Sequence, residues 1–140
     1  MLRLRQHIKF LTGDYLTAER LHRDNGSNPQ CKLCYAPLES VQHVLTQCTA
    51  TIDIHNRMLP ELLNVVLRVH PTCDFLRKGM QAQHLTQFLL DCTYLNLPPN
   101  CRVGAHNPNV GEIFTVSRNW CFAISRARSR LLQQRLNRKQ

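Results

Sequence analysis

Four residues of metal-binding type lie close together in the first third of the chain. They are Cys31, Cys34, His43 and Cys48, in the pattern C-x2-C-x8-H-x4-C. Thiolate and imidazole groups at these spacings suit a tetrahedral structural zinc site in which the protein fills every coordination position. The sequence therefore predicts one structural Zn²⁺ and leaves no open position for activating a water molecule, which argues against a catalytic metal.

This ligand set requires a distorted helix. An apolar stripe at helical spacing covers residues 41–48, and His43 lies on the opposite side of that helix. Residues five apart on an ideal helix differ in direction by about 140°, so His43 and Cys48 cannot both face one ion on a regular helix. We expect a π-type widening or a break near Gln47. A regular helix running well past Cys48 would make His55 the replacement ligand.

The remaining cysteines have wide, irregular spacing and are expected to be buried small apolar side chains. These are Cys73, Cys92, Cys101 and Cys121. A second zinc site that uses Cys92 and Cys101 is an alternative, as is a redox pair of Cys31 and Cys34, although the βαβ context of such a pair is missing. Residues 1–10 contain no signal-peptide apolar region. We therefore expect an intracellular protein, nuclear or cytoplasmic, whose thiols stay reduced.

The formal net charge of +9 is concentrated near the C-terminus. No acidic residue follows Glu112, whereas seven basic residues do. Guanidinium groups on an exposed helix bind phosphates with salt-sensitive, largely sequence-independent affinity, so RNA or DNA is the expected partner. The candidate nucleic-acid-binding residues are Lys32, Arg118, Arg126, Arg128, Arg130, Arg135, Arg138 and Lys139. The alternative interpretation is a solvated helix end, where the helix dipole favours positive charge.

The elements that position these residues are almost all expected to be helical. Apolar periodicity predicts helices over residues 2–11, 17–23, about 38–48, 51–70 and 81–92. Gly13 stands where the first helix should end, and Pro60 either opens a second helix or kinks a longer one. The last helix begins near Asn109, where Glu112 completes a capping pattern.

The predicted fold class is mainly α. A small helical domain over residues 1–95 is stapled by one CCHC zinc knuckle at residues 31–48. A loop over residues 96–109 and a long basic C-terminal helix over residues 110–140 follow. No stretch approaches the roughly 18 apolar residues of a membrane span.

Catalytic chemistry is not expected from this chain. It has only five glycines and no glycine-rich phosphate loop. Its nine carboxylates form no compact pair in the sequence, and Ser125 and Ser129 lie among arginines, as surface serines of a helix do. We therefore expect a binding module and not an enzyme.

The motif and its surroundings resemble a known family. Phe10-Leu11-Thr12-Gly13, Tyr15-Leu16 and Leu21-His22-Arg23, followed by the cysteine–histidine pattern, are similar to the zinc-binding segment downstream of non-LTR (LINE-type) retrotransposon reverse transcriptases. The resemblance covers about residues 2–69 and implies the same four ligands, together with nucleic-acid engagement near a polymerase. The chain has no polymerase aspartate pair, endonuclease or RNase H segment, so the resemblance implies a detached C-terminal piece.

Two functional hypotheses follow from the sequence. The first is a zinc module that binds nucleic acid. The second is a protein-interaction adaptor with a purely structural zinc site, in which Leu131, Leu132 and Leu136 of the last helix contact a partner helix or a membrane surface.

Overall fold

The computed structural model describes residues 1–69, 81–91 and 110–138, and every regular element within these ranges is helical. In chain order they are α1 (Leu2–Leu11), α2 (Ala18–Asn25), the π-helical turn η1 (His43–Gln47), the 3-10 turn η2 (Thr49–Thr51), α3 (Ile52–Val69), α4 (Ala82–Leu90) and α5 (Val110–Asn137). The predicted mainly α class with a cysteine–histidine knuckle and a long C-terminal helix is confirmed. The expected loop over residues 96–109 and the side chains of Cys73, Cys92, Cys101 and Lys139 lie outside the described residues.

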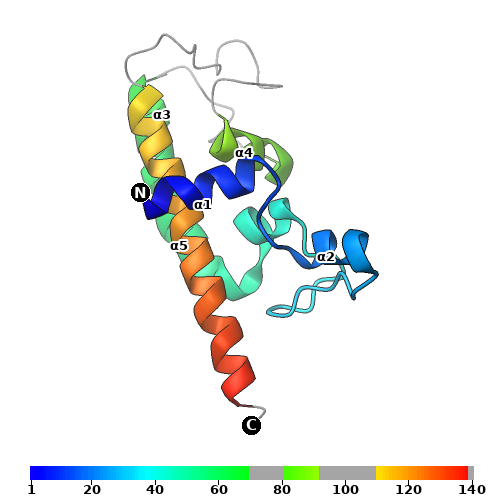
Figure 1. Cartoon of the computed structure of the whole chain (residues 1–140). Helices are drawn as coiled ribbons and strands as arrows, with labels where there is room; N and C mark the ends of the chain where they lie inside the picture. The colour runs from blue at the N-terminus through cyan, green and yellow to red at the C-terminus, as the bar shows by residue number, and fades with distance from the viewer. Residues whose placement is uncertain (70–80, 92–109, 139–140) are drawn as a thin grey trace.

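The longest described helix, α5, contacts most of the other helical elements. It packs on α1, α3 and α4, and on both short turns that flank Cys48. Figure 1 shows α3 running alongside α5 while α1 crosses its other side. Trp120 of α5 is fully buried, and its Nε1–H donates a 3.0 Å hydrogen bond to the carbonyl oxygen of Leu45. The core around Trp120 contains Phe10, Met58, Leu62, Val66, Phe88, Leu89, Ile113, Val116, Cys121 and Ile124.

The ends of the first two helices follow from local sequence. Thr17 caps α2, because its side chain accepts a 3.2 Å hydrogen bond from the backbone N–H of Arg20. Gly13 and Gly26 each adopt a φ of +72°, which suits glycine at the end of a helix. Pro60 lies inside the continuous helix α3, so the alternative in which it opens a separate helix is wrong.

The apolar stripe of α1 is not its buried face. Leu4, Ile8 and Leu11 are 47%, 46% and 50% exposed, whereas His7 and Phe10 are buried. The His7 imidazole makes a 2.9 Å hydrogen bond to the carbonyl oxygen of Leu89 in α4, so the side of α1 that carries His7 and Phe10 is the one packed into the molecule. None of the helices in the described ranges is long and apolar enough to cross a membrane.

Candidate metal centre

The paired cysteines sit on a tight turn. The backbone N–H of Tyr35 donates a 2.9 Å hydrogen bond to the carbonyl oxygen of Cys31, and the N–H of Cys31 donates a 2.9 Å bond to the carbonyl oxygen of Ala36. Tyr35 takes a positive φ of 63°, which is uncommon for a residue other than glycine and lets the chain reverse directly after Cys34. The turn therefore holds the two sulfur atoms on the same side of the loop.

The other two ligands come from a helix that widens, as the sequence predicts. His43–Gln47 forms a π-helical turn in which the N–H of Cys48 donates a 2.8 Å hydrogen bond to the carbonyl oxygen of His43. This i to i+5 bond brings side chains five residues apart towards one direction. Cys48 then leaves the helix with an extended backbone before η2 begins. His55 is not needed as a replacement ligand, and its ring packs edge-on against Trp120 at 5.3 Å.

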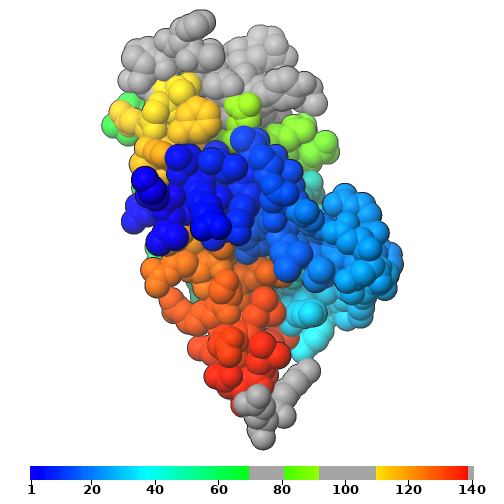
Figure 2. Space-filling view, in the orientation of Figure 1, coloured from blue at the N-terminus to red at the C-terminus, as the bar shows by residue number. Residues whose placement is uncertain are grey.

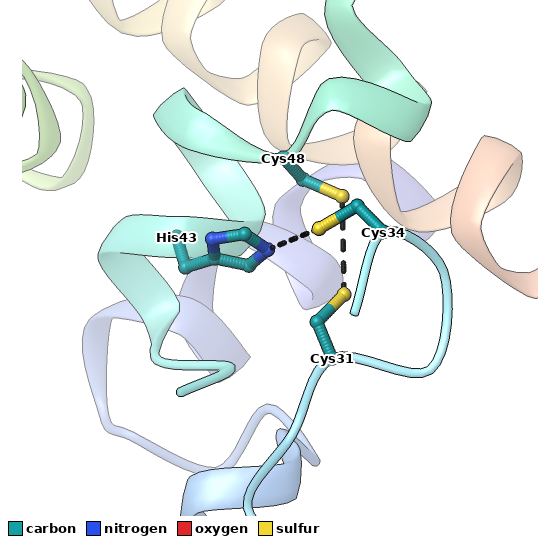
Figure 3. A group of neighbouring side chains, drawn as sticks. All are labelled: Cys31, Cys34, His43 and Cys48. Atoms are coloured by element: carbon teal, nitrogen blue, oxygen red, sulfur yellow. Dashed lines mark hydrogen bonds between the residues drawn. The ribbon is translucent and has the colours of Figure 1, made fainter. Parts of the chain in front are cut away.

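All four side chains converge on one point (Figure 3). One ligand atom from each of Cys31, Cys34, His43 and Cys48 lies within 4.8 Å of every other. The Cys34 Sγ is 3.3 Å from His43 Nε2, and the Cys31 Sγ is 4.0 Å from the Cys48 Sγ. Bonds of about 2.3 Å to sulfur and about 2.0 Å to nitrogen place tetrahedral ligand atoms roughly 3.5–3.8 Å apart, so the cluster fits a single metal ion.

Burial and hydrogen bonds shift the pKa values of the four candidate ligand side chains. Burial raises the pKa of the Cys31 thiol to about 12 and also raises the pKa of Cys48. Burial opposes ionisation of Cys34 too, but backbone N–H groups and the neighbouring thiols outweigh it and lower its pKa. The pKa of His43 is lowered by burial, against the attraction of the Glu39 carboxylate, so the imidazole is neutral near pH 7, as a metal ligand must be.

The far half of α5 packs on the knuckle. Leu131 and Leu132 lie partly buried against a small cluster formed by Cys31, Leu33 and Cys48. Arg135 donates 2.6 Å and 3.0 Å hydrogen bonds to the Leu33 carbonyl oxygen and the Tyr35 hydroxyl, and another to the carbonyl oxygen of Lys32. The C-terminal end of α5 is therefore hydrogen-bonded to the backbone of the cysteine turn.

A buried ion pair makes a second connection between the knuckle region and α5. The Glu39 side chain is 1% exposed, and its Oε1 lies 2.5 Å from Arg128 Nη2. The same oxygen accepts a 2.9 Å hydrogen bond from the backbone N–H of Ala18 at the start of α2. Sequence reasoning missed Glu39, because nothing in the local pattern marks a glutamate for burial when its partner lies 89 residues away.

The structure divides the predicted nucleic-acid-binding residues into two groups. Arg128 and Arg135 are engaged inside the molecule, as described above, and are poorly placed to meet a phosphate. Arg118 is partly exposed. The exposed members among the described residues are Lys32, Arg126, Arg130 and Arg138.

Comparison of the chain with protein-family models, with curated proteins and with solved structures gave no match. The similarity to the LINE-type zinc-binding segment therefore stays a prediction from the sequence. Of the cysteines outside the cluster, Cys121 is described, and it is fully buried as expected.

Proposed function

We propose that this chain is a non-catalytic zinc module that binds nucleic acid. In this proposal one Zn²⁺ is held by Cys31, Cys34, His43 and Cys48, and its role is to staple the knuckle against α5. The observation that carries the proposal is the convergence of these four ligand atoms within 4.8 Å of one another. The resemblance to the retrotransposon segment supports the same ligand set and the same kind of partner.

The donor set favours zinc in a structural role. Three thiolates and one imidazole suit tetrahedral zinc, and four protein ligands leave no position for water or substrate. Structural zinc contributes about 10–16 kcal/mol of binding free energy near pH 7 in small peptides. Typical domains have a net stability of only about 5–15 kcal/mol, so the metal would hold the fold together.

Metal content tests the first half of the proposal. The purified chain is expected to hold one zinc per molecule, measured by mass spectrometry of the metal. The variants Cys31→Ser and His43→Ala should lose that zinc, whereas Cys121→Ser should keep it, because Cys121 is buried in the main core away from the cluster. Stoichiometric zinc in all of these variants would contradict the ligand assignment.

The exposed cations support nucleic acid as the partner. Lys32, Arg118, Arg126, Arg130 and Arg138 are at least partly exposed, and none of them takes part in an ion pair between described residues. Such side chains release counterions when they meet phosphates. If most of the five contact a single strand, log Kobs should fall with log[salt] with a slope of about −2 to −3.5.

The salt series is the direct test of this half of the proposal. Binding of RNA and DNA oligonucleotides to the zinc-loaded chain is measured by fluorescence anisotropy from about 50 to 300 mM salt, a range over which phosphate contacts lose orders of magnitude in affinity. Binding that does not depend on salt, or no binding at the lowest salt, would contradict the proposed nucleic-acid binding. It would not affect the proposed zinc site.

A protein-interaction adaptor is the second candidate, and α1 favours it. Of the three leucines that the sequence suggested as a partner surface, Leu131 and Leu132 are partly buried on the knuckle, and Leu136 is 60% exposed. The outward stripe of Leu4, Ile8 and Leu11 is a better candidate surface for a partner helix. Loss of partner binding in Ile8→Gln, combined with normal nucleic-acid affinity, would identify this stripe as a separate interface.

A further inference from the structure

A groove between α1 and the middle of α5 brings together side chains from both helices. Its lining includes three arginines, Arg3, Arg118 and Arg126, beside Phe122 and Asn119. On the space-filling view, α1 in dark blue lies against the orange part of α5 (Figure 2). Arg118 and Arg126 are among the phosphate-binding residues predicted from the sequence, whereas Arg3 and Phe122 are not.

The arginines are held in place without being neutralised. The guanidinium carbons of Arg3 and Arg126 each lie 5.7 Å from the centroid of the Phe122 ring. Arg3 Nη1 donates a 2.8 Å hydrogen bond to Asn119 Oδ1, and Arg118 Nη2 donates a 3.2 Å bond to the Thr115 hydroxyl. Among the residues that the structure describes, no carboxylate lines the groove and none pairs with these arginines. Most of their N–H donors therefore remain available to a ligand.

The apolar part of the groove narrows the choice of ligand. Leu2 and Leu4 line it and are 67% and 47% exposed, next to the partly exposed ring of Phe122. A duplex would present mainly its phosphates here and leave this apolar surface unused. Unpaired bases can instead pack on apolar and aromatic side chains and stack on guanidinium planes, while their phosphates meet the remaining N–H groups.

We infer that the α1–α5 groove is a binding site for single-stranded nucleic acid, with Arg3, Arg118 and Arg126 contacting phosphates and bases and Phe122 fixing two of the guanidinium groups. This inference rests on the proposed function, and it locates that function at one site. It also gives α1 a direct part in binding, because α1 supplies Arg3, whereas the other two groove arginines among the described residues come from α5.

The test uses the full zinc-loaded chain and a labelled 15-nucleotide strand of mixed sequence, with its duplex as competitor, in fluorescence anisotropy at one low salt concentration. Arg3→Gln and Phe122→Leu should each weaken binding of the strand roughly fivefold or more, the lower end of the effect expected for a stacked base. Arg5→Gln and Arg57→Gln remove the same charge from exposed positions outside the groove. These controls should change the affinity less than about twofold, because a charge outside the groove that makes no contact with the strand is screened by salt. Thermal unfolding followed by circular dichroism confirms that each variant is folded.

Four outcomes would overturn the inference. If the wild type binds the strand and the groove variants bind it as tightly as Arg57→Gln does, the proposed function stands but the groove is not the binding site. Equal losses in groove and control variants would show that only total charge matters. A duplex that binds as tightly as the strand would remove the single-strand preference. Vesicles of phosphatidylserine and phosphatidylcholine that bind through the same residues, with no affinity for the strand, would reassign the groove to a membrane surface. Absence of any nucleic-acid binding by the wild type is the separate result that defeats the proposed function.

Discussion

Removing Arg128 should destabilise the fold strongly, because it leaves the Glu39 carboxylate buried without its charged partner. Glu39 is 1% exposed and the Arg128 side chain is 15% exposed. Breaking a buried ion pair from one side costs about 3–5 kcal/mol. In Arg128→Met the carboxylate keeps the hydrogen bond from Ala18, so we expect a loss near 3 kcal/mol. That is a large fraction of the roughly 5–15 kcal/mol that stabilises a typical domain.

Replacing Glu39 should lower the free energy of unfolding by less than replacing Arg128 does. In Glu39→Gln the amide oxygen can still accept the hydrogen bond from the Ala18 N–H, and Arg128, which already reaches the surface, can turn its charge towards water. We expect a loss of about 1–2 kcal/mol, typical of a weakened hydrogen bond to a charged group. The asymmetry between the two variants is the specific signature of a carboxylate that is buried more deeply than its partner.

Urea unfolding at saturating zinc, followed by circular dichroism, measures both losses. Arg130→Met is the matched control, since Arg130 lies on the same helix and is exposed, and it should stay within about 0.5 kcal/mol of the wild type. Metal content is checked for each variant so that a lost ion is not mistaken for a lost ion pair. An Arg128→Met variant as stable as the control, or less damaging than Glu39→Gln, would refute the reasoning.

Three further predictions concern the metal and the core. Chelation of the wild type should remove most of its helical circular dichroism signal, because the zinc free energy of about 10–16 kcal/mol matches or exceeds the stability of a small domain; a fold that survives strong chelator would contradict a stapling role. Zinc affinity should rise with pH between 6 and 8, since the metal must displace protons from Cys31, whose pKa is about 12, and from Cys48, whose pKa is also raised; a pH-independent affinity in chelator competition would argue against thiol ligands. Trp120→Phe should lower the free energy of unfolding by about 1–3 kcal/mol, because the buried carbonyl oxygen of Leu45 loses its 3.0 Å hydrogen bond, and a loss below about 0.5 kcal/mol would refute that estimate.

The metal centre was predictable because its geometry is local. The spacing of Cys31, Cys34, His43 and Cys48 limits how the side chains can meet, and the fixed rotation per residue of an α-helix rules out a regular turn between His43 and Cys48. The π-helical turn at His43–Gln47 is the distortion that this conflict demands. The end of the first helix at Gly13 was predicted for the same reason. The second helix was predicted over residues 17–23, whereas α2 starts after Thr17 and runs two residues further, to Asn25, before Gly26 ends it.

The orientation of α1 was not predictable from its own sequence. Periodicity in Leu4, Ile8 and Leu11 indicates a helix, but it does not say which side of that helix finds a partner. The buried side makes contacts outside α1: Phe10 stacks on Tyr15 just after the helix at 3.8 Å, and His7 makes a hydrogen bond to Leu89 of the distant helix α4. A buried histidine with an acceptor 82 residues away has no local signature.

The arginines of the basic C-terminal helix have two different roles. Arg126 and Arg128 are two residues apart, yet Arg126 lies over Phe122 on the exposed groove and Arg128 is paired with buried Glu39. Two residues on an α-helix differ in direction by about 200°, so Arg126, Arg128 and Arg130 alternate between an outer and an inner side. A count of positive charge therefore overstates the surface available to phosphates.

The inner arginines also link the cysteine–histidine cluster to the outer ones. Arg135 binds carbonyl oxygens of the cysteine turn. In the proposed zinc site, the position of those carbonyls would depend on the sulfur atoms of Cys31 and Cys34 sharing one ion. Leu131 and Leu132 rest on the same cluster, so the far half of α5 has its packing partner in the knuckle and not in the main core. A structural zinc ion would thus act beyond its own loop. By fixing the knuckle it would fix the axis of α5, and with it the direction in which the exposed arginines of that helix face a ligand.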